Sequence, residues 1–358
     1  MKITRLRQKI DQIDSKIVSL LGERAEVVFS VGQEKAKSNM GLHVPQREEE
    51  IFTRLMRQNT GRFPIHAIRP VFREIISACR SLEGPLKLAY LGPEGTFTHL
   101  ACTRRFGVSA HFVPVRSIGD VFAEVEKGNV EYGVVPIENS SEGVVSHTLD
   151  TFMESDLKIS GEILLEVSHS LLSKSGDLRK VKKIYSHPHA FAQSRKWLEA
   201  NLLRVPLFEA SSTAAAAKLA AKEPTAAAIA SELAASLYKL KVISRKIEDT
   251  PRNITRFLII GKTPATPTHR DKTSLMFSIK DRVGTLYRIL EPFAKHQINL
   301  TKVESRPSKT KAWEYIFYVD VEGHVADEPV KAALALLQEE CLFLKVLGSY
   351  PRGSSIES

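Results

Sequence analysis

Several features that usually narrow down a protein's function are scarce or missing in this chain. Of its 358 residues only three are cysteines, and Cys79, Cys102 and Cys341 are odd in number and far apart. This pattern argues against a disulfide framework and against a cysteine-based metal site. It favours a reducing environment, so we expect a cytoplasmic protein.

Long apolar runs are also missing. No stretch approaches the roughly 18 consecutive apolar residues that a membrane-spanning helix requires. Residues 1–12 carry charges throughout and lack the apolar segment of a secretory signal. We therefore expect a soluble protein that does not contact a membrane. Because 358 residues are too many for one ordinary hydrophobic core, we expect two or three domains.

Positive charge is in excess but is not concentrated anywhere. The formal net charge is +10, and the lysines and arginines are spread along the whole chain. Because no basic block is interleaved with aromatic residues, nucleic-acid binding is not predicted. A dispersed positive balance suits small anionic substrates, although solvated surface residues by themselves account for most of these charges.

The first 84 residues are predicted to be all-helical. Apolar residues recur at steps of three and four between Leu6 and Val31, which indicates one long amphipathic helix from about Thr4 to Lys37. Two shorter helices are predicted at about residues 46–58 and 65–83. Because a helix this long cannot bury its apolar stripe on two shorter ones, we expect an intertwined helical dimer.

Three cations of the first helix are candidates for a ligand site. Arg24 and Lys35 are eleven residues apart, which places them on nearly the same face. Arg7 precedes Arg24 by seventeen residues and points roughly 100° away, so one helix could not bring all three to a small ligand. A partner's helix could supply Arg7. Ordinary solvated helix charge explains the same spacing at least as well.

The motifs of this region resemble those of the all-helical chorismate mutases. The matching stretches are Leu6–Ile10, Glu23–Arg24, Val31–Lys35 and Arg47–Glu48. The resemblance implies a rearrangement of chorismate to prephenate, in which Arg24, Lys35 and Arg7 from the partner chain grip the substrate. It also implies that Glu48 binds the substrate hydroxyl, with Arg47 beside it. Such a reaction needs a cage of donors that compacts the substrate, and no covalent catalyst.

One residue near the end of the third predicted helix departs from the family pattern. Glu83 stands where some members have a glutamine that hydrogen-bonds the ether oxygen. A glutamate donates a hydrogen bond only when it is protonated. We therefore predict that acid favours the mutase reaction, or that neighbouring groups raise the pKa of Glu83.

Residues 86–262 alternate between predicted strands and helices in two successive sets. This order indicates an α/β domain with largely parallel sheets, arranged as two lobes and a cleft as in periplasmic binding proteins. The last strand, Asn253–Ile260, is apolar and β-branched but has Thr255 and Arg256 set into its start. These two polar groups need partners, which a bound anion would provide; plain solvation is the alternative.

Four polar clusters fall at predicted strand ends, where the ligand sites of α/β proteins gather. They are Gly92–Thr98, Pro136–Gly143, Ser186–His189 with Gln193, and Thr255–Arg256. The glycine loop could hold an anion on backbone N–H groups, although a turn or a helix cap explains each cluster taken alone. His187 and His189 do not predict a metal site, because a proline separates them and no matching ligand cluster accompanies them.

Together the four clusters resemble the motifs of the prephenate dehydratases, in the same order and spacing. The resemblance implies that prephenate loses water and carbon dioxide to give phenylpyruvate. It makes Thr255 the acid that helps hydroxide to leave C4, and Arg256 a residue that helps to hold a substrate carboxylate. Further matches to substrate-binding or catalytic positions are Thr96, Glu138, Asn139, Ser186 and Gln193. Neither a cofactor nor a metal is implied.

Residues 272–351 follow the order strand, helix, strand, strand, helix, strand, which predicts a ferredoxin-like unit. This unit resembles an ACT regulatory domain. The matching motifs comprise Gly284, Thr285 and Leu286 in one segment and Glu304, Ser305, Arg306 and Pro307 in another. The resemblance implies feedback inhibition by L-phenylalanine at an interface between two such domains; a purely structural dimerisation domain is the alternative.

The sequence thus predicts a multidomain α and α/β protein with an all-helical chorismate mutase domain (1–84), a two-lobed prephenate dehydratase domain (86–262) and an ACT domain (272–351). The resemblance implies a bifunctional enzyme of phenylalanine biosynthesis and a homodimer or a dimer of dimers. An arogenate dehydratase with the same centre is one alternative. A non-catalytic sensor is another, but it would need neither the Thr255 hydroxyl nor the mutase cations, and it would usually carry an output module.

Overall fold

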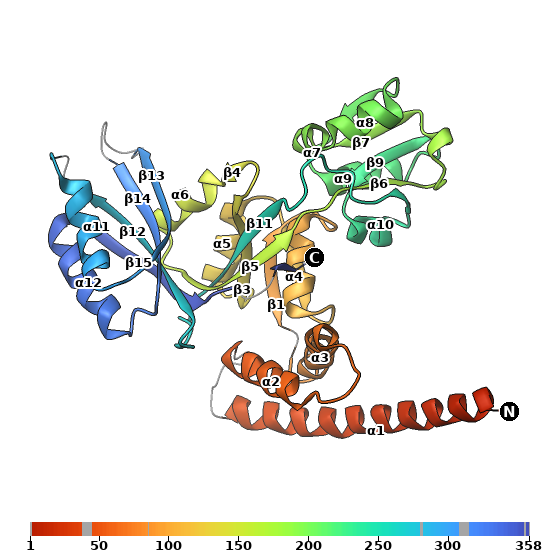
Figure 1. The fold of residues 1–358 in the computed structure, drawn as a ribbon, viewed down its shortest axis with the longest axis horizontal. Coiled ribbons are helices and arrows are strands. Elements are labelled where there is room, and N and C mark those ends of the chain that lie inside the picture. Colours follow the sequence, from red (N-terminus) through yellow and green to blue (C-terminus); the bar gives the residue numbers. More distant parts are fainter. Residues whose placement is uncertain are drawn as a thin grey trace. The chain divides into compact units, whose positions relative to one another are not determined.

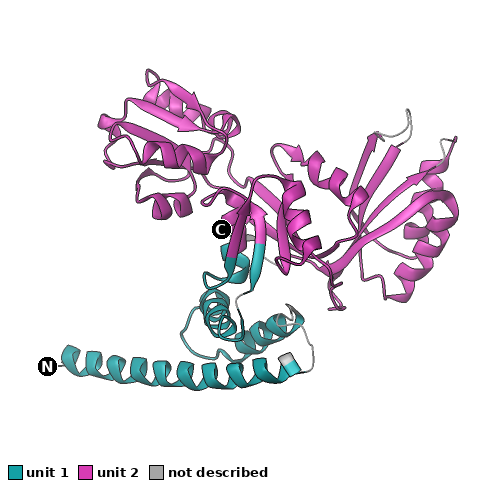
Figure 2. Ribbon diagram, turned by 180° about the vertical axis from the view of Figure 1, so that it is seen from behind, with its two compact units in different colours: residues 1–88, 103–111 teal, residues 89–102, 112–358 magenta. Residues whose placement is uncertain are grey.

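The computed structural model describes residues 2–37, 45–84, 86–279, 282–307, 315–353 and 356–357 (Figure 1). The chain forms two compact units, which Figure 2 colours separately. The first comprises Met1–Leu88 with Thr103–His111, and the second Ala89–Cys102 with Phe112–Ser358. None of the helices in the described ranges combines the length and the apolarity that crossing a bilayer requires.

The first unit is built on three helices, α1 (Lys2–Lys37), α2 (Pro45–Gln58) and α3 (Ile65–Arg80). These agree with the predicted helices, except that α3 ends before Glu83 at a cap formed by Ser81. Every residue from Lys2 to Leu20 is exposed, including the apolar stripe of α1. Ile10 and Ile13, for example, keep 55% and 48% of their surface in solvent. The first half of α1 therefore carries an apolar face that no part of the described ranges covers.

The second unit begins with a sheet in which the strand order is β16-β5-β11-β3-β1-β2, with β4 paired to β3. Its strands are β1 (Lys87–Leu91), β2 (His111–Val115), β3 (Tyr132–Asn139), β4 (Gly143–Val144), β5 (Lys158–Glu166), β11 (Ile254–Gly261) and β16 (Ile356–Glu357). The helices of this lobe are α4 (Phe97–Phe106), α5 (Ile118–Lys127) and α6 (Ser146–Glu154). The central strand β11 runs antiparallel to both of its neighbours, so the expectation of largely parallel sheets is wrong here. The reason is that β11 re-enters this lobe after the chain has built a second one.

The second lobe is a sheet with the order β10-β6-β9-β7-β8. Its strands are β6 (Ser170–Ser173), β7 (Lys183–Ser186), β8 (Leu207–Glu209), β9 (Ala226–Ala230) and β10 (Lys241–Ser244). Its helices are α7 (Pro188–Gln193), α8 (Arg195–Leu202), α9 (Thr213–Ala220) and α10 (Glu232–Tyr238), besides the 3₁₀ turn η1 (Leu178–Lys180). Two crossovers join the lobes, one from β5 to β6 and the other from β10 to β11.

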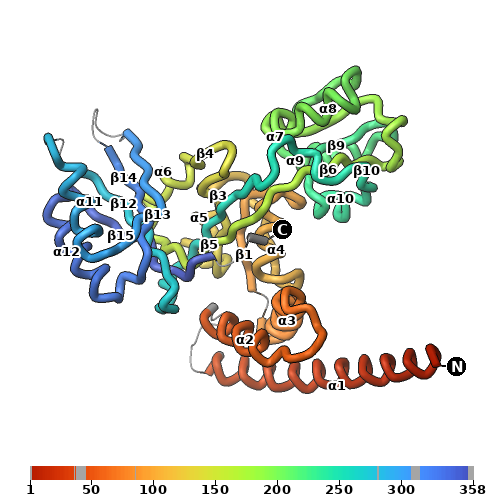
Figure 3. The backbone as a smooth tube through the Cα atoms, viewed as in Figure 1, coloured from red at the N-terminus to blue at the C-terminus, as the bar shows by residue number. Residues whose placement is uncertain are grey.

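The third sheet has the antiparallel order β13-β14-β12-β15. Its elements are β12 (Asp271–Ile279), α11 (Thr285–Lys295), β13 (Leu300–Pro307), β14 (Tyr315–Glu322), α12 (Glu328–Glu340) and β15 (Cys341–Pro351), which confirms the predicted ferredoxin-like order. Figure 3 shows both helices on one face of this sheet. Its other face shares a core with the first lobe, to which Met276, Tyr318 and Tyr350 contribute.

Candidate functional site

Thr255 and Asn139 lie directly opposite each other on β11 and β3. The Asn139 amide nitrogen donates to the Thr255 hydroxyl over 2.7 Å and to the Asn253 side-chain oxygen over 2.6 Å. Thr255 is buried, with 8% of its surface exposed. The strand pairing that the apolar sequence of β11 enforces thus brings two of the predicted dehydratase residues into contact.

The backbone fixes the orientation of the Asn139 amide. Its oxygen accepts from the backbone N–H groups of Ser141 at 2.8 Å and Glu142 at 3.0 Å. Because N–H groups can only donate, the other end of the amide must be the nitrogen, which therefore faces Thr255. The Thr255 oxygen accepts this hydrogen bond, which leaves the hydroxyl able to donate its own proton.

The same polarity extends to Gln193. The Asn253 nitrogen donates to the Gln193 side-chain oxygen over 3.0 Å, and the Gln193 nitrogen donates to Glu142 over 2.9 Å. Gln193 comes from α7 of the second lobe and Glu142 from the first, so this bond joins the two lobes. We did not predict Asn253 and Glu142 as site residues. The sequence did contain a signal for Asn253. It precedes Thr255 by two positions, and residues two apart in an extended chain face the same side.

Two other predicted residues serve local structure. The Ser186 hydroxyl is fully buried at the end of β7 and donates to the Ile229 carbonyl over 2.9 Å. The Thr96 hydroxyl donates to the Leu91 carbonyl and accepts from the His99 N–H, both over 3.3 Å. The structure therefore places both hydroxyls in backbone contacts of their own, apart from the Thr255–Gln193 network.

The glycine loop before α4 is also internally bonded. Gly95 has a φ of +87° and lies so close to Ala234 that an added Cβ would be 3.3 Å from its Cβ, which favours glycine here. The Gly95 N–H donates to the His99 ring over 3.1 Å, and its carbonyl accepts from Ser231 of the second lobe over 3.0 Å. The loop thus uses this N–H for its own structure, and it contacts the other lobe directly.

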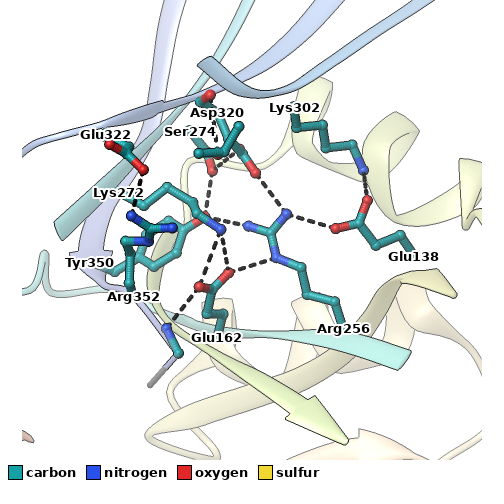
Figure 4. Close-up of polar contacts among 12 residues, drawn as sticks. Glu138, Glu162, Arg256, Lys272, Ser274, Lys302, Asp320, Glu322, Tyr350 and Arg352 are labelled. Atoms are coloured by element: carbon teal, nitrogen blue, oxygen red, sulfur yellow. Dashed lines mark hydrogen bonds and ion pairs between the residues drawn. The ribbon is translucent and has the colours of Figure 1, made fainter. Parts of the chain in front are cut away.

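Arg256 and Glu138 lie on the opposite side of the sheet from Thr255. Adjacent residues of a strand point to opposite faces, and Arg256 pairs with Glu138 just as Thr255 pairs with Asn139. Four acceptors surround the guanidinium in Figure 4: Glu138 at 3.0 Å, Glu162 and Asp320 at 2.7 Å and the Tyr350 hydroxyl at 2.8 Å. The expectation that Arg256 and Glu138 share one site with Thr255 is therefore corrected, because protein carboxylates already hold the arginine.

Charge balance keeps this second cluster ionised. Burial alone would raise the pKa of Glu138, but the hydrogen bond and charge of Lys302, together with Arg256, hold that pKa below its usual value. Burial also acts to raise the pKa of Glu162, but the charges of Arg256 and Lys272 outweigh burial and hold that pKa below its usual value. Lys302 lies 2.5 Å from Glu138. Three residues of the third sheet, Asp320, Tyr350 and Lys302, thus contact the back of the two strands that carry Thr255 and Asn139 (Figure 4).

The first unit holds the cations that we predicted for a mutase. One terminal nitrogen of the Arg24 guanidinium is buried and has no hydrogen-bond partner in the described structure. The Lys35 ammonium lies 3.4 Å from the Glu83 carboxylate. Arg7 is exposed. An unsatisfied buried donor costs about 1–3 kcal/mol, so the Arg24 nitrogen indicates a place for an acceptor that the described residues do not supply.

The acidic end of α2 is arranged differently from the expectation. Glu48 accepts hydrogen bonds from Arg80 over 2.7 Å and from Arg105 over 3.3 Å. Arg47 is exposed and bonds Glu50 on its own helix over 3.1 Å. The structure therefore shows Glu48 held by two arginines. The role of Glu48 toward a substrate hydroxyl, like the acid dependence of Glu83, stays a prediction.

The two predicted effector motifs lie on α11 and β13. Gly284 has a φ of +80° and caps α11, Thr285 is buried, and Leu286 keeps 50% of its surface exposed. On β13, Glu304 is half-buried and Ser305 and Pro307 are exposed. The Arg306 guanidinium donates to the Ser146 carbonyl over 2.7 Å and to Asp150 over 3.1 Å, both on α6. Arg306 thus contacts the first lobe directly.

Metal chemistry has no visible support in the described ranges. No group of three or more histidine, cysteine, aspartate or glutamate side chains converges there as metal ligands would. His187 and His189 stack edge to face, with 4.9 Å between ring centroids. His189 also lies 3.2 Å from Glu142.

Comparisons with known proteins agree with the three-part organisation. Family models match for chorismate mutase type II at residues 6–84, for prephenate dehydratase at 88–265 and for the ACT domain at 273–335. A bifunctional chorismate mutase/prephenate dehydratase of Aquifex aeolicus is 52% identical over 98% of each chain. The corresponding Pseudomonas aeruginosa protein is 42% identical over the same shares.

Solved structures match the dehydratase and ACT portions. A prephenate dehydratase from Arthrobacter aurescens, in complex with L-Phe, is 34% identical, with a TM-score of 0.70 over 76% of this chain and 92% of that one. A protein described as a novel type of quorum quenching acylase is 31% identical, with a TM-score of 0.69 over 75% of this chain and 98% of that one. Because proteins of this fold are described with two different activities, the activity must be argued from site residues.

Proposed function

The chain belongs to the family of bifunctional chorismate mutase/prephenate dehydratases with an ACT domain. From this premise we propose which residues carry out each of the two reactions. It is an enzyme with both activities. The helical unit rearranges chorismate to prephenate. The two-lobed domain converts prephenate to phenylpyruvate, and L-phenylalanine is the feedback effector of the ACT domain. The lack of apolar spans and of disulfide pairs in the sequence supports a cytoplasmic setting.

The observation that supports the dehydratase centre most strongly is the one-way hydrogen bond from Asn139 to Thr255. The Thr255 proton passes to the hydroxyl leaving C4, the C4–O bond breaks and water departs. The ring carboxylate leaves as carbon dioxide, and its bonding electrons complete the aromatic ring. A threonine is a weak acid, so the Asn139 N–H must stabilise the negative charge that develops on the Thr255 oxygen. The threonine then regains a proton from solvent.

We assign the remaining dehydratase residues by the side they face. Gln193, which shares the Thr255 network, binds the substrate. Ser186 and Thr96 shape the adjoining strand end and helix start through their backbone contacts. Glu138 and Arg256 support β3 and β11 from behind, through the ion pairs on the other face of the sheet.

The mutase centre is completed by a second copy of the chain. The buried, unpartnered Arg24 nitrogen and Lys35 supply two cations from one chain. Arg7 lies in the exposed half of α1, whose apolar stripe fits the same stripe of a partner. A shared helical interface buries both stripes and brings the partner's Arg7 to the ligand, which favours a homodimer as the minimal assembly.

Incubation with chorismate tests the assignment. Chorismate loss and phenylpyruvate formation are followed separately in the wild type, in Thr255→Ala and in Thr255→Ser. We expect Thr255→Ala to stop phenylpyruvate formation while prephenate accumulates at the wild-type rate, and Thr255→Ser to retain part of the activity because it keeps a hydroxyl. Phenylpyruvate formed by Thr255→Ala at more than about a tenth of the wild-type rate would rule out Thr255 as the acid.

A further inference from the structure

A buried histidine touches the dehydratase network from the crossover between β5 and β6. His169 keeps only 3% of its surface exposed. Its ring meets Phe97, at the start of α4, edge to face with 5.4 Å between centroids. Its Nε2 lies 2.8 Å from the Gln193 side-chain oxygen. The histidine is therefore held against the residue that bridges the two lobes.

The polarity of the network determines which ring nitrogen carries the proton. The backbone fixes Asn139, Asn139 fixes Asn253, and Asn253 donates to the Gln193 oxygen. The Gln193 oxygen can only accept, so His169 must donate from Nε2. The Nδ1 atom then carries no proton and can only accept a hydrogen bond. It is buried and has no partner in the described structure. Burial lowers the pKa of His169, and the Gln193 contact and Glu248 oppose this only in part, so the ring is neutral at neutral pH.

We propose that His169 is a positioning residue of the dehydratase, whose Nε2–H fixes the Gln193 amide so that its nitrogen faces Glu142 and keeps one N–H for a substrate carboxylate. The inference rests on the proposed function of the two-lobed domain. The Gln193 nitrogen carries two hydrogens, and Glu142 accepts one of them. The second hydrogen has the polarity that a dicarboxylate substrate needs.

The donor matters because the two ends of an amide have nearly the same shape. Without His169, only Asn253 holds the Gln193 oxygen and only Glu142 holds the nitrogen, so a flipped amide becomes more accessible. A flipped amide turns its oxygen toward the substrate carboxylate, where two acceptors repel each other. The loss of one hydrogen bond and its partner costs about tenfold or more in binding. Since the carboxylate is present before and during the reaction, this loss raises KM more than it lowers kcat.

Three replacements of His169 separate the Nε2 donor from the rest of the ring. His169→Phe keeps a ring against Phe97 but has no donor, and we expect KM for prephenate to rise about tenfold with kcat changed less than threefold. His169→Gln places an amide N–H close to the position of Nε2 and restores KM to within about threefold of the wild type. His169→Asn is too short to reach Gln193 and resembles His169→Phe. Mutase turnover of the same samples and their melting temperatures report whether each variant is folded.

A double-mutant cycle with Gln193→Ala distinguishes the positioning role from a purely structural one, because only the positioning role makes the effect of His169→Phe on KM depend on Gln193. If His169 acts through Gln193, His169→Phe raises KM less than twofold in the Gln193→Ala background. His324→Phe is the matched control, because His324 is also buried, at 6% exposure, but lies in the ACT domain. We expect its KM for prephenate to stay within twofold of the wild type.

The outcomes distinguish this inference from the proposed function. A wild-type protein that forms no phenylpyruvate from prephenate contradicts the dehydratase assignment itself. An active wild type with additive effects of His169→Phe and Gln193→Ala overturns only the positioning role. A His169→Gln variant as weak as His169→Phe overturns it too, because the unpartnered Nδ1 would then be the important atom.

Discussion

The direction of a single hydrogen bond decides what Thr255 can do. Asn139 donates to the Thr255 oxygen because two backbone N–H groups occupy the other end of its amide. The motif in the sequence indicated these residue types, but it did not contain this polarity. The polarity follows from the short turn after β3, in which Ser141 and Glu142 reach back to the asparagine. A threonine in this position is a polarised donor rather than a solvated hydroxyl.

An aspartate at position 139 would reverse that polarity. In Asn139→Asp the carboxylate must accept the Thr255 proton and would meet two backbone donors, so the geometry survives while the acid is lost. We expect kcat for phenylpyruvate formation to fall about 10²- to 10³-fold, as for removal of an oxyanion donor. Asn201→Asp, at an exposed asparagine of α8, is the control and should stay within twofold. Steady-state kinetics with prephenate measure both, and a decrease below fivefold in Asn139→Asp would contradict the proposed donor role.

The structure brings together the predicted residues whose side chains share a face of the sheet, and it separates those that alternate along a strand. Thr255, Asn139 and Gln193 were expected together, and the structure joins them. Arg256 was expected beside Thr255 because the two are adjacent in the motif, although adjacent strand residues point to opposite faces. His169 was overlooked because a single histidine between two serines, outside any motif, carries no signal of function.

At the level of elements, periodicity predicted the helices and strands well. The long helix, the alternation of the two lobes and the βαββαβ order all follow from apolar spacing and turn residues. The antiparallel setting of β11 did not, because spacing along a strand says nothing about the direction of its neighbours. The direction of β11 depends on the path of the chain, which leaves the first lobe after β5, forms the second lobe and then re-enters the first.

The exposed stripe of α1 leads to a prediction for the helical unit. Ile13 is 48% exposed, so a charge there costs the monomer little but would disrupt a helix–helix interface. We expect Ile13→Glu to sediment as a smaller species and to lose most of its mutase activity, since Arg7 would no longer reach a partner's ligand. Prephenate conversion by the same sample should stay within about threefold.

The control for this experiment lies on the same helix. Ser15 is exposed and points about 200° away from Ile13, so Ser15→Glu adds the same charge to the other face. Sedimentation velocity and a chorismate-loss assay compare the two variants. Equal mutase activity in Ile13→Glu and Ser15→Glu would exclude this stripe as the shared interface.

For the whole molecule, motifs predicted the order of the domains but not the contacts between them. Arg256 meets Asp320 and Tyr350, which lie 64 and 94 positions further along the chain. No periodicity in one segment reports a partner at that distance. The cost of the buried charges explains why the partners must be there: leaving one of them unpaired would destabilise the fold by about 3–5 kcal/mol. The cluster therefore fastens the ACT domain to the two strands that carry the candidate acid and its donor.

Strand β13 carries two contacts to the first lobe, one just before the predicted effector motif and one within it. Lys302 bonds Glu138 on β3, Arg306 bonds α6, and the predicted effector motif begins at Glu304 between them. An effector that changes β13 must alter one or both contacts, and Glu138 lies directly behind Asn139. Contact alone does not demonstrate coupling, so the test must separate effector binding from its consequence.

Replacement of Lys302 should weaken the response to L-phenylalanine while leaving its binding intact. In Lys302→Gln the ammonium is lost but Arg256 still holds Glu138, so we expect basal phenylpyruvate formation within about threefold of the wild type. The L-phenylalanine concentration for half-inhibition should rise about tenfold, which corresponds to about 1.4 kcal/mol of lost coupling. Lys345→Gln is the matched control, since Lys345 also reaches the first lobe but bonds the Phe152 and Ser155 carbonyls from β15. Calorimetry measures L-phenylalanine binding in both variants, and unchanged inhibition in Lys302→Gln, or equal desensitisation in Lys345→Gln, would exclude this contact as the route.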